Sequence, residues 1–332
     1  MRLTQKKLDK TLKQMDYIIK LYKKKYSKVE KRDWRTYEQR LAYRIKTAAK
    51  ELEPIIEEAY SSIEMAKEEA RGRPRDITVP KKILILLLKE IFQLSNRKMA
   101  NLLMFFTVLS GIDTSYKTVE RVYSDPIVRM TIHNMYAILV KKKGIEDADL
   151  TGDGTGYSLT IIKHYRNVSG KKGVKEGKKT EKGRKLFAYS FGLMDIDTRM
   201  YVGYGTSLKS EKEAYKRAIL MASTMGITAR SIRLDKYYSN RTILKDFPDA
   251  KIYIIPKKNA TIRGPKEWKE ILVRFIEDIF SYLSEYYQRN NSESGFSVDK
   301  RMCGWKVWQK REERIDTCLL CKGIWHNMML IG

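Results

Sequence analysis

Three carboxylates in the second half of the chain lie where a metal-dependent site could be assembled. Asp153 lies in the glycine-rich stretch TGDGTG, Asp235 ends the apolar segment SIRLD, and Glu293 lies in a later helical segment. Because α/β sheets gather functional groups at the ends of their strands, we expect these three side chains to meet. Taken singly, each acid has an ordinary interpretation as a turn, capping or solvated residue. Asp149 is the alternative to Asp153 in the first position.

The residue types indicate which metals such a site would take. Three carboxylates in a chain with only three histidines favour hard, oxygen-ligated Mg²⁺ or Mn²⁺ over zinc. Two such ions about 4 Å apart can activate a water molecule and stabilise the leaving oxygen of a phosphodiester. The chemistry predicted from these residues is therefore metal-assisted cleavage of a polyanionic substrate.

A second pattern surrounds the third carboxylate, in the segment YYQRNNSESGFSVDK at 286–300. Four residues at positions i, i+3, i+7 and i+14 share one face if the segment is helical; they are Tyr286, Arg289, Glu293 and Lys300. The residues between them are poor helix formers, so this face is not an ordinary apolar stripe.

The charge balance points to the same class of partner. Lys and Arg number 67 against 40 Asp and Glu, a formal net charge of +27. Such an excess favours nucleic acid, with an anionic membrane surface as the weaker alternative. The longest aliphatic run, ILILLL at 83–88, is far too short to span a bilayer, and the N-terminus lacks the apolar core of a secretory signal. We expect a cytoplasmic, nucleoid-associated protein that does not enter the membrane.

The cysteines give little support for a disulfide or a zinc site. Three cysteines are an odd number, which does not make a disulfide framework and suits a reducing compartment. Cys318 and Cys321 form a CxxC pair with Cys303 and His326 nearby, so a Cys₃His zinc site is conceivable. The segment TCLLCKGIWHNMML is helically periodic, with no turn residues between the cysteines. Buried helical cysteines are the preferred interpretation.

Residues 144–332 are predicted to form an α/β domain with the order β-β-β-α-β-α-β-α. The first strand ends or bends in the glycine-rich turn around Asp153, and the strand KIYIIP ends at Pro256. The remaining predicted elements are strands in 185–194, 199–207 and 231–235, helices in 210–226 and 239–247, a long helical stretch from Pro265, and a last helix at about 311–330.

The N-terminal part is predicted to be all-α. Residues 1–76 are a basic helical region, and residues 77–143 contain three short helical patterns. Their spacing fits a helix-turn-helix whose recognition helix, SYKTVERVY, would present Tyr116, Lys117 and Arg121 to DNA. An ordinary three-helix cluster is the structural alternative.

A short basic stretch joins these two N-terminal regions. The sequence RGRPR resembles a minor-groove AT-hook, which would place Arg71 and Arg73 in the groove. A plain basic linker is the preferred interpretation, because the motif is short and common.

The motifs together resemble a known family. DGTG from Asp153 and RLDKYYSN around Asp235 resemble the first and second aspartate motifs of the DDE transposases of bacterial and archaeal insertion sequences. The segment at 286–300 matches the family's Y-(2)-R-(3)-E-(6)-K signature at all four positions. The resemblance covers about 145–330 and implies a ribonuclease-H-like core, a five-stranded mixed sheet with flanking helices, preceded by an all-α DNA-binding region.

The resemblance also implies roles for the individual residues. Asp153, Asp235 and Glu293 would be the catalytic ligands of two Mg²⁺ or Mn²⁺ ions. Arg289 and Lys300 would grip phosphates of the transposon end, and Tyr286 would pack or hydrogen-bond against the DNA backbone. The activity would be cleavage at the transposon ends and joining of the 3′-OH ends to target DNA. The partner would be double-stranded DNA, bound by a homodimer or larger assembly.

The spacing between the second and third acids departs from that of some relatives, which carry a large insertion there. Only 58 positions separate Asp235 from Glu293 (293 − 235), so no inserted domain fits between them. One alternative is a DNA-binding regulator or decayed transposase, which the complete set of motif residues disfavours. The other is a ribonuclease-H-like nuclease or resolvase that cuts without joining.

Overall fold

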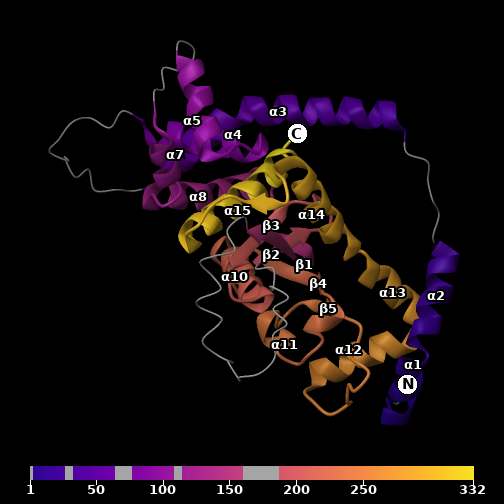
Figure 1. The fold of residues 1–332 in the computed structure, drawn as a ribbon. Helices are drawn as coiled ribbons and strands as arrows, with labels where there is room; N and C mark the ends of the chain where they lie inside the picture. The colour runs from indigo at the N-terminus through magenta and orange to yellow at the C-terminus, as the bar shows by residue number, and fades with distance from the viewer. Residues whose placement is uncertain (1–2, 27–32, 64–76, 108–113, 160–186) are drawn as a thin grey trace, which may run out of the picture.

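The computed structural model describes residues 3–26, 33–63, 77–107, 114–159 and 187–332. A mixed sheet lies in the middle of the molecule, with helices of the C-terminal half around it and helices of the N-terminal half along its upper and outer sides (Figure 1). The AT-hook-like arginines, Arg71 and Arg73, lie outside the described residues. Within the described ranges, no helix is long and apolar enough to cross a membrane.

The sheet follows the order β3-β2-β1-β4-β5. Strands β1, β2 and β3 pair antiparallel, whereas β4 runs parallel to β1 and β5 runs parallel to β4. The prediction of a mixed sheet is confirmed, and a very short sixth strand, β6, adds to the end of β1. The strands are β1 (Asp147–Leu159), β2 (Phe187–Asp195), β3 (Tyr201–Ser207), β4 (Thr228–Arg233), β5 (Lys251–Tyr253) and β6 (Lys306–Val307).

Two predicted strand boundaries were wrong. Strand β1 does not end or bend at Asp153, because β2 pairs with it continuously from Leu150 to Ser158. Strand β5 does not reach Pro256, because the backbone of Ile254 hydrogen-bonds to a side chain and not to a neighbouring strand. The Tyr282 hydroxyl lies 2.9 Å from the Ile254 amide nitrogen and 3.0 Å from its carbonyl oxygen. In both cases a partner distant in sequence decides where the ladder ends.

Helices cover the sheet on both faces. On one face lies α10 (Glu211–Thr224), which packs on β3 and β2. On the other face α13 (Ile279–Tyr287) contacts β4 and β5, α14 (Asn290–Cys303) contacts β1 and β2, and α15 (Glu312–Met328) contacts β3. The apolar core runs through both layers. Smaller elements complete this half, namely η1 (Lys236–Tyr238), α11 (Ile243–Asp246) and α12 (Lys266–Glu277).

The described residues of the N-terminal half form helices. Tyr22 of the second helix stacks on Tyr287 with ring centroids 5.2 Å apart, so the first two helices lie against α12 and α13. Helices α4, α5 and α7 meet over a small separate core that includes Ile85, Met99 and Val119. The N-terminal helices are α1 (Gln5–Lys13), α2 (Met15–Tyr26), α3 (Trp34–Ser61), α4 (Val79–Ile91), α5 (Asn96–Phe105), α7 (Tyr116–Val122) and α8 (Pro126–Lys142).

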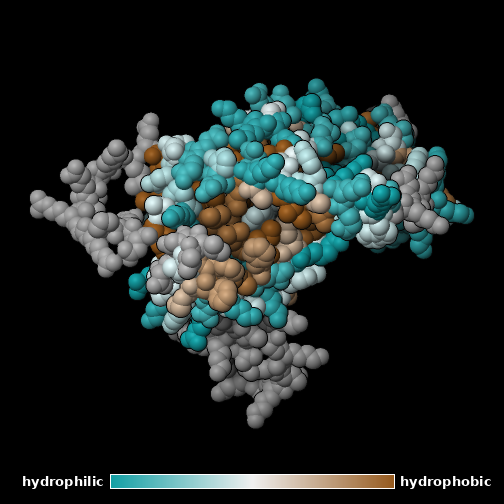
Figure 2. Space-filling model, turned by 90° about the horizontal axis from the view of Figure 1, so that it is seen from above, coloured by the Kyte–Doolittle hydropathy of each residue, from teal (hydrophilic) through white to brown (hydrophobic). Residues whose placement is uncertain are grey.

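One surface of the molecule is conspicuously apolar. Seen from above, hydrophobic side chains gather in the middle of the face, and hydrophilic side chains surround them (Figure 2). Apolar areas of this kind on a protein surface commonly mark interaction sites.

Close packing of α10 on the sheet gives a prediction about stability. A Cβ atom on Gly205 would lie 1.9 Å from the carbonyl oxygen of Ala214, a backbone atom that cannot rotate away. We expect Gly205→Ala to lower the free energy of unfolding by about 1–3 kcal/mol, because α10 must shift. Gly156→Ala is the control, since its Cβ would meet only the Phe187 side chain, at 3.3 Å. Urea unfolding with equal midpoints for the two variants would contradict this account.

Candidate active site

The side chains of one face of β1 point toward α14. The Thr151 hydroxyl lies 3.2 Å from the Ser292 hydroxyl and donates to the carbonyl oxygen of Arg289 at 3.3 Å. Four residues further along the strand, the Thr155 hydroxyl accepts a hydrogen bond from Lys300 of α14 at 2.5 Å. Asp153 lies between these two contacts on the same face, because side chains alternate along a strand. The first carboxylate therefore lies under α14.

The parallel pairing of β1 and β4 places the second carboxylate beside the first. Thr151 is paired with Arg233 at the end of the ladder. Asp235 comes two residues after Arg233, beyond the end of β4, and its negative charge raises the pKa of Asp153. The packing agrees, since a Cβ on Gly152 would touch the Leu234 side chain at 2.7 Å.

An arginine connects the first carboxylate to the third. Arg289 lies at the N-terminus of α14, one turn before Glu293. Its guanidinium is 2.5 Å from Glu293 Oε1 and 3.6 Å from Asp153 Oδ1. The Asp153 side chain is 19% exposed and that of Glu293 is 48% exposed. Arg289, which is 13% exposed, thus joins Asp153 to Glu293, and the charge of Asp235 acts on both Asp153 and Arg289.

The pKa of Asp153 reflects its burial and its charged neighbours. Burial raises the pKa of Asp153 to about 6, and the negative charges of Glu293 and Asp235 act in the same direction. The Arg289 guanidinium and the Gly154 amide oppose this increase but do not cancel it. A raised pKa in a carboxyl group with acidic neighbours is typical of functional sites.

The other two residues of the 286–300 pattern lie on either side of this cluster. Tyr286 belongs to α13 and not to the helix of Glu293, because α13 ends at Tyr287 and α14 begins only at Asn290. Its ring centroid is 5.9 Å from the Arg289 guanidinium. Burial raises the pKa of Tyr286 to about 12. Burial also lowers the pKa of Lys300, which lies beside the rings of Tyr157 and Trp305.

Asp149, the alternative first ligand, has a different environment. It lies near the start of β1, where its carboxylate accepts from the Ser231 hydroxyl and forms an ion pair with Arg230 at 2.8 Å. Arg233 joins Asp149 to Glu285 of α13. This network ties the start of β1 to β4 and α13.

A buried polar clamp that the sequence did not suggest holds α14 in place. Asp299 is fully buried and accepts from the Tyr201 hydroxyl at 2.8 Å, while His326 Nδ1 lies 2.7 Å from its other oxygen. The second ring nitrogen of His326 contacts the carbonyl oxygen of Arg199 at 2.9 Å. The partners are 98 and 27 positions apart, so no local spacing signals the clamp.

The cysteines behave as buried hydrophobic groups. All three are free and buried, which confirms that interpretation of the sequence. Burial raises the pKa of the Cys318 thiol well above its usual range, and this thiol donates to Glu90 at 3.2 Å. Across the described ranges, no three His, Cys, Asp or Glu side chains stand close enough together to hold a metal ion.

The predicted recognition helix lies apart from the carboxylates. Helix α7 begins at Tyr116 after Ser115, which caps it by accepting from the Thr118 amide. Tyr116, Lys117 and Arg121 are exposed on it. The Arg97 guanidinium of α5 lies over the Tyr116 ring at 5.0 Å. These three side chains lie on the surface of α7, whose Val119 packs in the small core shared with α4 and α5.

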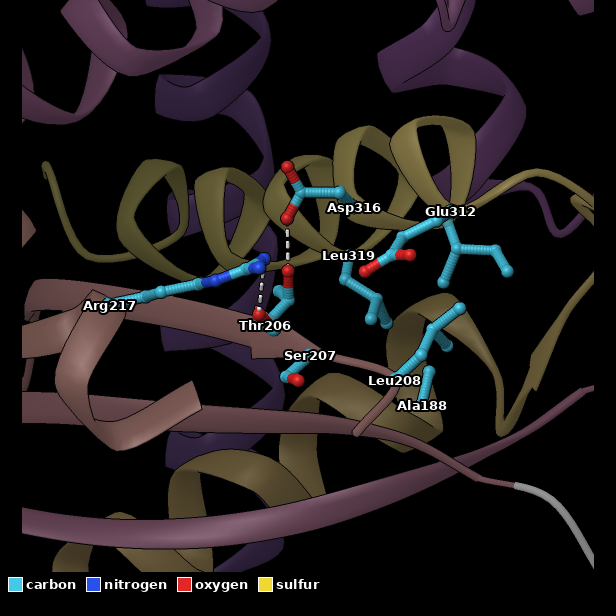
Figure 3. Close-up of a pocket in the computed structure, with 9 residues that line it drawn as sticks. Ala188, Thr206, Ser207, Leu208, Arg217, Glu312, Asp316 and Leu319 are labelled. Carbon is cyan, nitrogen blue, oxygen red and sulfur yellow. Dashed lines mark hydrogen bonds between the residues drawn. The ribbon is translucent and has the colours of Figure 1, made fainter. Parts of the chain in front are cut away.

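A small crevice elsewhere offers no room for a ligand. It lies where Thr206 of β3, Arg217 of α10 and Asp316 of α15 meet, and Arg217 donates to the Thr206 carbonyl at 2.9 Å (Figure 3). Its volume of about 10 Å³ would hold about one water molecule.

Comparison with known proteins places the chain in a family. It belongs to the transposases of insertion sequences. Over 288 residues it is 41% identical to a probable transposase for insertion sequence element ISA1214 from Archaeoglobus fulgidus, a match that covers 86% of this chain and 85% of that protein. No protein-family model matches the chain, and no solved structure matches it.

The clamp around Asp299 gives a prediction about pH. Burial alone would lower the pKa of His326, but the Asp299 carboxylate raises it above 6.5. The pairing therefore stabilises the fold fully below the unfolded pKa of about 6.5 and loses its effect as pH rises through the higher folded value. We expect His326→Asn to cost most stability near pH 6 and progressively less toward pH 9, measured by urea unfolding. A cost that grows with pH would show that the histidine is neutral in the fold.

Proposed function

We propose that the chain is a DDE transposase with a ribonuclease-H-like core, in which Asp153, Asp235 and Glu293 are the catalytic carboxylates. The observation that supports this proposal is that Arg289 pairs with both Asp153 of β1 and Glu293 of α14, while the charge of Asp235, in the segment after β4, acts on Asp153. The substrate would be double-stranded DNA, both the transposon ends and the target. The reaction would be hydrolysis at the ends followed by transfer of the 3′-OH to target DNA.

The donor types suit Mg²⁺ or Mn²⁺, but among the described residues no three such side chains stand close enough together to hold an ion, so the three carboxylates would have to move together around a bound ion. Three carboxylates supply hard oxygen ligands, and burial of Asp153 near the negative charges of Glu293 and Asp235 makes a nearby positive charge favourable. Arg289 supplies that charge here, lying between Asp153 and Glu293. Bound divalent ions would supply a stronger positive charge there, activating a water molecule and stabilising the leaving oxygen.

Arg289 and Lys300 are suited to hold the DNA backbone beside the carboxylates. The Arg289 guanidinium lies beside Asp153 and Glu293, so it would reach a phosphate bound at these carboxylates. The guanidinium fork matches the geometry of phosphate. Lys300 presents its ammonium two residues further along β1, next to Thr155. The two neighbouring acids available as alternative partners are engaged elsewhere, Glu285 with Arg233 and Asp299 with His326.

Further DNA contacts belong to this proposal. Tyr116, Lys117 and Arg121 on α7 would read or grip duplex DNA as a helix-turn-helix does. Paired cutting and joining of two ends would require a homodimer or larger assembly on DNA. The apolar area surrounded by hydrophilic side chains in Figure 2 supports an interaction between protein chains.

Substitution of the carboxylates tests the proposal directly. We expect Asp153→Asn and Glu293→Gln to reduce Mg²⁺-dependent cleavage of a transposon end by at least about 1,000-fold, because each amide keeps the shape but removes a ligand charge. Asp149→Asn is the matched control, since its carboxylate serves the Arg230 pair. Gel analysis of end cleavage measures the effect. If Asp149→Asn alone abolished cleavage, the first ligand would be wrongly assigned.

Assays of end binding, cleavage and strand transfer on the same protein distinguish the proposed function from its alternatives. A regulator or decayed transposase binds ends but cuts none. A nuclease or resolvase cuts but does not join a pre-cut 3′-OH end to target DNA. Strand transfer by the wild type, lost in Asp235→Asn, would support the transposase.

Lys300 gives a prediction that does not depend on cleavage. A phosphate contact releases counterions, so we expect Lys300→Ala to lower the slope of log K against log salt by about 1. Lys216→Ala is the control, because Lys216 is exposed on α10 across the sheet. Fluorescence anisotropy on a transposon-end duplex measures both slopes. Equal slopes for wild type and Lys300→Ala would show that Lys300 only supports Thr155.

A further inference from the structure

The segment that follows the third carboxylate's helix combines cations with exposed aromatic rings. Residues 300–311, KRMCGWKVWQKR, contain five Lys and Arg and no Asp or Glu. Trp305 is 63% exposed and Trp308 is 47% exposed. Indole rings of this size are normally covered, so two neighbouring exposed ones in a basic segment need a reason.

The backbone beneath these rings is fixed. The Ser158 amide donates to the carbonyl oxygen of Trp305 at 3.1 Å, and the next two residues form β6 on the end of β1. Gln309 is buried and donates to Asn96 at 3.3 Å. The two tryptophans are therefore exposed on an ordered support that ties the sheet to α5.

A buried lysine and a glycine set the turn that precedes Trp305. Gly304 has a φ of 78°, and a Cβ there would lie 2.7 Å from the Gln93 side chain. Lys322 is fully buried and donates to the Gly304 carbonyl at 3.2 Å. Gln93 in turn donates to the Met302 carbonyl at 3.2 Å. Aromatic rings presented on a preorganised backbone lose little freedom on binding a partner.

The aromatic pair is connected to the carboxylate site. The Lys300 ammonium lies 4.9 Å from the centroid of the Trp305 ring while it hydrogen-bonds to Thr155. Thr155 is two residues beyond Asp153 on the same face of β1, about 7 Å along the strand. A polyanionic strand lying on Asp153 would therefore continue past Lys300 onto the tryptophans.

We propose that Trp305 and Trp308 form a stacking platform for unpaired bases of the DNA strand that enters the carboxylate site. Paired bases in a duplex have their faces covered by neighbours, whereas an unpaired base can lie on an indole ring. Lys306, exposed between the two tryptophans, would neutralise the phosphate of the stacked nucleotide. The five cations favour nucleic acid over an apolar protein partner. The assignment of the strand rests on the proposed function.

The test is a binding measurement without added divalent ions, so that no cleavage occurs. The probes are a labelled single-stranded oligonucleotide of mixed sequence and a duplex of equal length. We expect Trp305→Ala together with Trp308→Ala to weaken single-strand binding by about 5- to 150-fold for each base stacked, and to leave duplex binding within about twofold. Trp305→Phe should retain most of the affinity, because it keeps an aromatic face.

Trp34→Ala is the matched control, because Trp34 is 64% exposed on α3, in another part of the molecule. The platform is refuted if the double alanine variant loses affinity for the single strand and for the duplex to the same extent. It is also refuted if that variant binds both probes as tightly as the wild type does, and this result would assign the surface to a protein partner. The outcome is separable from the catalytic assignment. Cleavage lost in Asp153→Asn with unchanged single-strand binding in the tryptophan variants would retain the transposase site and reject the platform alone.

Discussion

The candidate site depends on one ionic arrangement, the Arg289 guanidinium between Asp153 and Glu293. The negative charges of Glu293 and Asp235 act on Asp153, and burial of Asp153 makes its own charge more costly still. Arg289 offsets this cost by pairing with Asp153 and with Glu293, which come from different elements. Because the arginine lies at the first turn of α14, its position is set by how that helix sits on β1. The geometry of the site is therefore a consequence of helix packing.

That packing is secured at both ends of α14 by buried polar groups. At the start, Thr151 and Ser292 join hydroxyl to hydroxyl. At the end, Lys322 binds the Cys303 and Gly304 carbonyl oxygens and lies 3.8 Å from Glu90 of α4. Burial alone would raise the pKa of Glu90, but the charges of Lys89 and Lys322 lower it. Such a group is costly to leave unpaired, so the N-terminal helices are tied to the helix that carries Glu293.

The sequence allowed prediction of the order of strands and helices along the C-terminal half of the chain, because alternation, turn residues and helical periodicity are local signals. It did not allow prediction of the ends of β1 and β5, which pairing with β2 and the Tyr282 hydroxyl decide. A two-residue strand such as β6 is too short to give any periodic pattern. The bridging role of Arg289 was also beyond the sequence, since the same spacing permits pairing with other acids.

The glycines around Asp153 show how a local signal can mislead. They suggested a turn, yet β1 runs straight through them. Their role is close packing: a Cβ on Gly154 would lie 2.3 Å from the Glu211 side chain at the start of α10. Across the ladder, Gly192 faces Asp153, and a Cβ there would meet the Tyr201 ring at 2.5 Å. Absent side chains thus let helices approach β1 from both faces, so Asp153 stands on a strand clamped between two layers. A carboxylate on such a strand keeps its position when the charge of its partner changes, which a loop residue could not do.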